Sequence, residues 1–189
     1  MHPGNNDIVR IVRKICVSVA EYVTDKSINF TFNTDINEKI IACDPDKIET
    51  ILLNLISNAI KFNKPEGSVA VNILDEGESI LISVEDTGAG VPLERQGEVF
   101  ERFMQVDKSL TRDCEGSGIG LSLVKSYVEM HNGEIWLESE LGKGSKFAFR
   151  LRCIALDSEK TGNISNDSSR KEYNDSVERI NIEFSDIYK

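Results

Sequence analysis

The chain has 189 residues, a net charge of −10, 40% hydrophobic residues and 29% charged residues. This length fits one ordinary domain with some chain to spare, and the apolar share is enough for a core. Because the charge is acidic and no basic stripe offsets it, nucleic acid is disfavoured as a partner. The sequence contains neither an apolar run able to span a membrane nor a secretory signal. The four cysteines are far apart and form no C-x-x-C pair, which is typical of reduced thiols in a cytoplasmic protein.

Helical and alternating patterns follow one another along the first 153 residues. Apolar residues at helical spacing predict a helix over 8–23, with Asp7 as its N-cap. Asp44 and Pro45 are typical of a second helix start, and this helix is expected to end near Asn63. Helices mixed with hairpin-like antiparallel strands indicate an α+β two-layer sandwich. The other expected elements are strands at 28–32, 40–41, 69–73, 80–84, 135–138 and 146–151, and a helix at about 118–131.

The composition changes near residue 156, after which the chain becomes polar and nearly free of aliphatic residues. Such a segment buries too little surface to offset its ordering entropy. We therefore expect one domain over 1–155 and a largely flexible tail over 156–189. Near the end of the tail, apolar residues alternate over 177–184, which is typical of a short half-buried strand that docks on other structure.

Three polar side chains form a narrow stripe on the second predicted helix. At about 100° per residue, Asn54, Asn58 and Lys61 fall at the edge of its apolar face. Asparagine is a poor helix former in mid-helix, so two of them there indicate a purpose other than helix stability. Their amide oxygens suit a hard cation and the lysine suits an anion. A solvated polar stripe is the alternative, and this helix taken alone favours the alternative.

Two glycine-containing segments follow the predicted strand at 80–84. Asp86 is followed by Gly88 and Gly90, and glycines two apart let a backbone approach a flat ligand. The carboxylate can accept a hydrogen bond from an exocyclic amine such as that of adenine, although an ordinary glycine turn is also common. The segment 116–121 opens the last predicted helix, where backbone N–H groups can bind phosphate. Its spacing fits neither the P-loop nor the dinucleotide-binding fingerprint.

Taken together and in this order, four segments resemble the N box, first glycine box, F box and second glycine box of sensor histidine kinases. These segments are 54–62, 86–90, 100–103 and 116–121, respectively. The segment after the F box, 105–111, is similar to the ATP lid of that family. The resemblance covers about 5–153 and implies the Bergerat (GHKL) fold, a mixed and mostly antiparallel sheet covered by three helices, with a mobile ATP lid.

The resemblance also implies roles for individual residues. Asn58 and Asn54 resemble Mg²⁺ ligands, Lys61 resembles a ribose- or phosphate-contacting base, and Asp86 resembles the residue that reads the adenine amine. The expected catalytic residues are Asn58, Lys61 and Arg102. Arg102 and Lys108 resemble cations of the lid that lie near the terminal phosphate. For Lys108, a solvated surface charge is the alternative. The residues expected to contact ATP are Asn54, Asn58, Lys61, Phe62, Asp86, Gly88, Gly90, Val91, Lys108, Gly116, Gly118, Ile119, Gly120, Leu121 and Ser145.

The resemblance implies the ATP-binding catalytic domain of a bacterial two-component kinase. Such a domain uses ATP and Mg²⁺ to phosphorylate a histidine on a phosphotransfer and dimerisation domain, and a response regulator acts downstream. Neither His2 nor His131 has the sequence context of that acceptor histidine, so this fragment is not expected to phosphorylate itself. We expect a monomeric, cytoplasmic fragment of a protein anchored in the membrane.

Three other functions share parts of this pattern. ATP-hydrolysing machines of the same fold carry a glutamate four residues before the metal-binding asparagine, where this chain has Asn54, which cannot act as a base. Serine kinases of the anti-sigma type lack the pattern found here at 100–111. A nucleotide-responsive binding module without catalysis is the third alternative.

Overall fold

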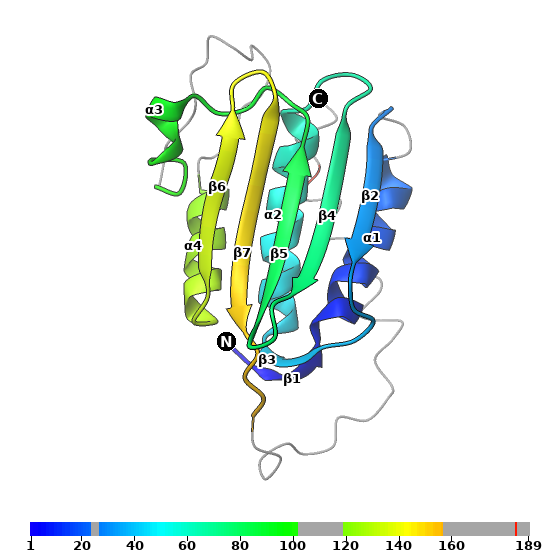
Figure 1. The fold of residues 1–189 in the computed structure, drawn as a ribbon, viewed down its shortest axis with the longest axis vertical. Coiled ribbons are helices and arrows are strands. Elements are labelled where there is room, and N and C mark those ends of the chain that lie inside the picture. Colours follow the sequence, from blue (N-terminus) through cyan, green and yellow to red (C-terminus); the bar gives the residue numbers. More distant parts are fainter. Residues whose placement is uncertain (24–26, 102–118, 157–183, 185–189) are drawn as a thin grey trace.

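The computed structural model describes residues 1–23, 27–101, 119–156 and 184. Three longer helices cover one face of a five-stranded sheet, which confirms the two-layer α+β fold (Figure 1). The elements are β1 (Gly4–Asp7), α1 (Ile8–Val23), β2 (Asn29–Thr34), β3 (Ile40–Cys43), α2 (Pro45–Lys61), β4 (Ser68–Asp75), β5 (Ser79–Asp86), α3 (Leu93–Gln96), α4 (Gly120–Met130), β6 (Glu134–Glu140) and β7 (Gly144–Arg152).

The sheet is mixed, as the family resemblance implied. Its order is β2-β4-β5-β7-β6, and every neighbouring pair is antiparallel except β2 and β4, which are parallel. Apolar alternation along a strand does not distinguish the two orientations, so the sequence pattern alone did not predict the parallel pair. Asp86 and Ser145 lie opposite each other at one end of the β5–β7 pair.

Both predicted helix starts lie where the sequence placed them. The backbone N–H of Val9 donates to Asp7 Oδ1 at 3.1 Å, which confirms Asp7 as the N-cap of α1. Asp44 occupies the cap position of α2, and Pro45 is the first helical residue. The Asp44 carboxylate makes no side-chain cap hydrogen bond to the helix; its Oδ2 accepts a hydrogen bond from the backbone N–H of His2 at 2.6 Å.

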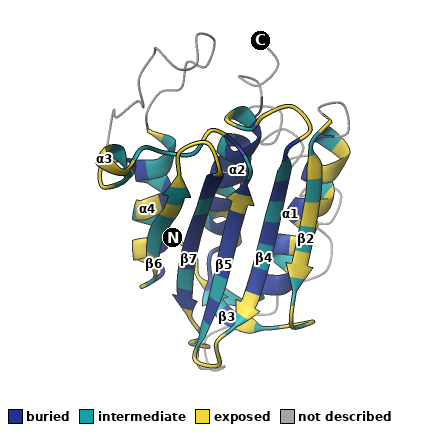
Figure 2. Cartoon of the chain, turned by 45° about the horizontal axis from the view of Figure 1, so that its top comes forward, coloured by how far each residue is buried: buried dark blue, intermediate teal, exposed yellow. Residues whose placement is uncertain are grey.

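The hydrophobic core lies between the sheet and the helices, and α2 is at its centre (Figures 1 and 2). Alternate residues of β4, β5 and β7 are buried against the helices, as period-two patterning requires. The buried surface of α2 is wider than one predicted face, since Leu53, Ile56 and Ile60 are also buried. The cause is that α2 packs against both α1 and α4 as well as against the sheet.

A small second sheet, formed by β1 and β3, was not predicted in full. The sequence indicated β3, but the four residues Gly4–Asp7 have little strand propensity and became a strand by pairing with β3. The backbone N–H of Ala42 also donates to the carbonyl of Ile154 at 2.6 Å. The Asn5 side chain forms two hydrogen bonds with the backbone of Leu156, at 2.9 and 2.7 Å.

The predicted strand at 177–184 lies outside the described residues except for Phe184, which is in a turn. The Phe184 side chain is fully buried and belongs to the core cluster. Within the described ranges, no helix combines the length and apolarity needed to cross a membrane.

Candidate functional site

The side chains of the polar stripe predicted on α2 become more exposed to solvent toward the C-terminal end of the helix. Asn54 is buried, at 6% exposure, Asn58 and Lys61 are half-buried, and Phe62 at the end of the helix is 41% exposed. The Lys61 ammonium lies 5.8 Å from the centroid of the Phe62 ring. A merely solvated stripe does not explain a buried asparagine, because burying an amide is unfavourable unless it is bonded.

Asn54 joins α2 to the start of α4. Its Nδ2 donates to the carbonyl of Thr50 at 3.2 Å, one turn earlier in the helix. Its Oδ1 occupies the space that a side chain on Gly120 would need, since a Cβ placed there would overlap this oxygen. The second glycine segment therefore meets the N box through direct contact of these two residues.

Asp86 supplies a buried carboxylate at the end of β5. Its side chain is 8% exposed, and Oδ1 accepts a hydrogen bond from the backbone N–H of Gly88 at 2.7 Å. Burial raises the pKa of Asp86 above its ordinary value, and hydrogen bonds from the backbone N–H groups of Gly88 and Ser145 offset only part of that effect. Such a carboxylate gains from a further hydrogen-bond donor, which an exocyclic amine provides.

The first glycine segment needs its glycines for contact with the rest of the protein. A Cβ on Gly88 would overlap the carbonyl oxygen of Phe62, and a Cβ on Gly90 would overlap that of Glu140. Gly90 also has a φ of 70°, which favours glycine. Contact with these carbonyls is thus a constraint on both positions that the sequence did not predict, and the approach of this backbone to a flat ligand stays a prediction. The contacts hold the loop between the end of α2 and the β6–β7 turn.

A hydroxyl network that the sequence analysis missed fixes the loop after Gly90. The Ser139 hydroxyl accepts from the backbone N–H of Val91 and donates to the carbonyl of Gly144, both at 2.8 Å. It also lies 3.0 Å from the hydroxyl of Ser145. The Gln96 amide donates to the carbonyls of Val91 and Ser139 at 2.9 Å. Isolated serines and glutamines carry no sequence signal of this kind.

The far end of α4 is bound to α2 by His131. The backbone N–H of Asp44 donates to His131 Nε2 at 3.0 Å, and His131 Nδ1 lies 2.7 Å from the carbonyl of Tyr127. Because Nε2 accepts, the ring is the neutral tautomer that carries its proton on Nδ1. Lys47 adds a hydrogen bond to the Tyr127 hydroxyl at 3.2 Å.

Part of the predicted site lies outside the described residues, namely Arg102, Lys108, Gly116 and Gly118, together with the segment similar to an ATP lid. Of the adjacent residues, Ile119 is exposed and Leu121 is half-buried and packed on the core. No side chain in the described ranges caps the N-terminus of α4. Phe100, at the start of the F box, packs edge-to-face on Phe147, with ring centroids 6.2 Å apart.

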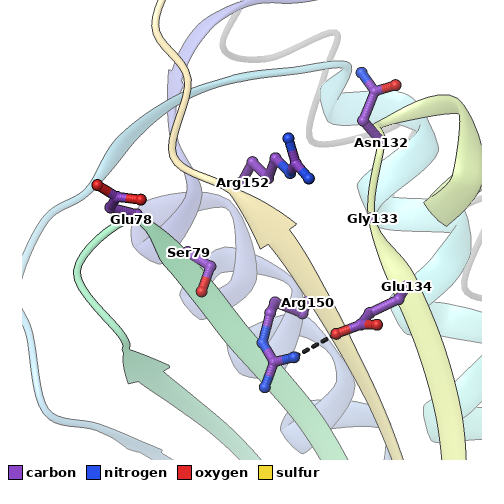
Figure 3. A pocket seen from close by; sticks show the side chains of 7 residues that line it. All are labelled: Glu78, Ser79, Asn132, Gly133, Glu134, Arg150 and Arg152. Atoms are coloured by element: carbon purple, nitrogen blue, oxygen red, sulfur yellow. Dashed lines mark hydrogen bonds and ion pairs between the residues drawn. The ribbon is translucent and has the colours of Figure 1, made fainter.

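A separate cleft of about 660 Å³ lies at the opposite end of the strands from Asp86 (Figure 3). Two arginines and two glutamates line it, so its charges offset one another, and Arg150 is already paired with Glu134. It is therefore a poor site for a triphosphate. Among the described residues, no group of three or more His, Cys, Asp or Glu side chains could hold a metal ion. The cleft is lined by Glu78, Ser79, Asn132, Gly133, Glu134, Arg150 and Arg152.

Residues 43–154 match the family model described as histidine kinase-, DNA gyrase B-, and HSP90-like ATPase. The circadian input-output histidine kinase CikA of Synechococcus elongatus is 43% identical over 108 residues, which are 57% of this chain and 14% of that protein. The sensor histidine kinase WalK of Bacillus subtilis is 36% identical over 151 residues, 78% of this chain and 25% of that protein. The chain thus spans a quarter or less of the length of these relatives.

Solved structures give the same likeness. The catalytic domain of the histidine kinase ThkA in a nucleotide-free form has a TM-score of 0.71 and 27% identity, covering 81% of this chain and 97% of that one. Full-length ShkA in complex with AMPPNP has a TM-score of 0.70 and 27% identity, covering 82% of this chain and 32% of that one.

Proposed function

Because the chain belongs to the family of histidine kinase-, DNA gyrase B-, and HSP90-like ATPases, we propose that it is the ATP-binding catalytic domain of a sensor histidine kinase. In this proposal, the domain binds Mg-ATP and transfers the γ-phosphoryl group to a histidine of a phosphotransfer and dimerisation domain in the same full-length kinase. A response regulator then takes the phosphoryl group. The full-length protein is anchored in the bacterial membrane, and this domain acts on the cytoplasmic side.

The convergence of three sequence boxes on the second half of α2 carries the proposal. Asn54 contacts Gly120 of the second glycine box, and the carbonyl of Phe62 accepts from the backbone N–H of Ala89 in the first glycine box at 3.0 Å. A buried acceptor, Asp86, and the N-terminus of α4, which no side chain in the described part of the chain caps, thus lie beside the same helix. A purine amine fits the former and phosphates fit the latter.

The residues present fit a magnesium ion at Asn58. Its amide oxygen is a hard ligand, and Mg²⁺ needs only one or two protein ligands when phosphates supply others. We assign Asn54 to positioning the start of α4, because its Oδ1 already faces Gly120. When bound, Mg²⁺ neutralises phosphate charge; Lys61 adds a second positive charge near the same end of α2. Positioning and charge neutralisation are the main requirements of phosphoryl transfer.

Two features support transfer to a histidine of another domain. The first argues against hydrolysis, and the second argues against His131 of this chain as the acceptor. Asn54 stands where hydrolysing relatives of this fold carry a glutamate, and an amide cannot activate water as a base. His131 is buried with both ring nitrogens in hydrogen bonds, so it is unsuited to accept a phosphoryl group.

The test uses the Asn58→Ala variant with Asn33→Ala as a matched control on the edge strand β2. We expect Asn58→Ala to abolish the Mg²⁺-dependent part of ATP binding in a calorimetric titration, and Asn33→Ala to leave it unchanged. Radiolabelled γ-ATP is then supplied with and without a separately expressed phosphotransfer domain. Label on the histidine of that domain supports the kinase. Rapid phosphate release by the fragment alone supports an ATPase, and binding without either reaction supports a nucleotide-responsive module.

A further inference from the structure

Phe184 and Tyr22 form an aromatic contact between the two ends of the chain. Their ring centroids are 5.1 Å apart and the ring planes meet at 80°, an edge-to-face arrangement. Phe184 is fully buried, and Tyr22 packs on the core from the last turn of α1. Edge-to-face pairs at this distance are favourable beyond the surface that they bury.

Phe184 lies outside the region that matches the family, whereas Tyr22 lies within the wider resemblance at 5–153. The family model matches 43–154, and Phe184 lies 30 residues beyond the end of that match. The Phe184 side of the contact is therefore an addition to the common domain. It connects the first long helix of the domain, α1, to a residue beyond the matched region.

We propose that the end of α1 forms an internal docking site for an aromatic side chain, and that Phe184 occupies this site as the anchor of the C-terminal tail. The occupant is this chain's own residue Phe184, which belongs in the sequence to the segment 177–189. That segment carries apolar residues at alternate positions up to Phe184 in an otherwise polar tail, so the tail contains one hydrophobic end suited to docking.

Burial of the Phe184 ring provides the favourable free energy for docking of the tail on α1. A phenylalanine that packs only loosely on a surface keeps part of its area in water, whereas this side chain has lost all of it. An otherwise polar tail has few other apolar side chains whose burial could offset the conformational entropy that it loses on ordering. The ring of Phe184 is therefore the part of the tail whose removal should release it.

The test measures thermal unfolding and ¹⁹F NMR of the full chain labelled with 3-fluorotyrosine. The chain has four tyrosines, and Tyr22→Phe identifies the Tyr22 resonance. Phe184→Ala should shift that resonance and lower the melting temperature by roughly 5–15 °C, the range for loss of a buried phenylalanine in a domain of this size. Phe184→Leu should also shift the resonance, because the ring is gone, but should restore most of the melting temperature.

A second readout and a control keep the proposal falsifiable. The Tyr22→Ala/Phe184→Ala double variant should lose less stability than the sum of the single variants, as contacting residues do. ATP affinity well below the melting temperature should stay unchanged in all of them. The proposal is overturned if Phe184→Ala leaves the Tyr22 resonance and the melting temperature unchanged. It is equally overturned if Tyr173→Ala, which removes another ring from the same tail, has the same effect on stability.

Discussion

The side-chain oxygen of Asn54 fills the space that a Cβ on Gly120 would occupy. Two residues that look unfavourable on their own, an asparagine in mid-helix and a glycine in the first turn of another helix, thus complement each other. Each sacrifices helix propensity, and the combined result is a close approach of α2 to the N-terminus of α4. The proposed phosphate-binding end of α4 is positioned by this contact.

Gly120→Ala is therefore expected to push α4 away from α2. We expect overpacking to cost about 1–3 kcal/mol of stability and to weaken ATP binding at least about tenfold. Adding Asn54→Ala removes the obstructing oxygen and should recover the stability lost by Gly120→Ala. Denaturant unfolding and calorimetric titration of the single and double variants measure both effects. If the double variant lost as much free energy of unfolding as the two single variants together, the Asn54 side chain would not be the atom group that a Cβ at position 120 meets.

Asp86→Asn should separate stability from binding. The asparagine Oδ1 can keep the hydrogen bond from Gly88, but its Nδ2 then replaces the second carboxylate oxygen and meets the adenine amine as donor against donor. We expect ATP affinity to fall about 10- to 100-fold, the cost of one unsatisfied buried polar pair, while the fold persists. Unchanged affinity for ATP in a calorimetric titration would remove Asp86 from the adenine site.

The same variant has a predictable pH dependence. Because burial raises the pKa of Asp86 in the folded state, its contribution to stability is complete below the ordinary carboxyl pKa and is lost as pH rises through the raised value. The melting temperature of Asp86→Asn relative to the natural chain should therefore increase as pH rises from about 4 through the raised value. A difference that decreases over this range would contradict the assignment of a desolvated carboxylate.

Gly88→Ala and Gly97→Ala form a matched pair. A Cβ at position 88 would overlap the carbonyl oxygen of Phe62, whereas no atom lies within 4 Å of a Cβ at position 97. We expect Gly88→Ala to lower stability by about 1–3 kcal/mol, because backbone must shift on both sides. Gly97→Ala should change it by less than about 0.5 kcal/mol. Chemical denaturation of both variants tests the difference.

His131→Leu should loosen the other end of α4. It leaves the backbone N–H of Asp44 without its acceptor in a buried place, at a cost of about 1–3 kcal/mol. His131→Gln retains an acceptor and should recover part of that loss, as followed by thermal unfolding. Equal destabilisation by leucine and glutamine would show that ring packing, and not the hydrogen bond to Asp44, joins the helices.

The helices and strands with strong periodicity were predicted from the sequence, and the two-layer fold was predicted with them. β1 and the parallel pairing of β2 with β4 were not, because both depend on partners distant in the chain. Asp86 and Asn54 were singled out from the sequence, and the structure finds both buried; their roles in binding stay predictions. The close contacts at Gly88 and Gly90 were not predicted, because the atoms that exclude a Cβ come from the ends of other elements. Ser139 and Gln96 were missed, since a single hydroxyl or amide gains its role only through folded geometry.

The paired hydrogen bonds between Asn5 and the backbone of Leu156 place the entry and exit of the domain side by side. A chain with this closure suits circular permutation: a short linker could join the two flanks, and new termini could open at the exposed turn around Gly77, where no atom lies within 4 Å of a Cβ. A pull on the segment before Asn5 would load the hydrogen bond from His2 to Asp44 and the β1–β3 pairing together with these two bonds. Mechanical load would thus reach the small sheet and the other flank before the five-stranded sheet.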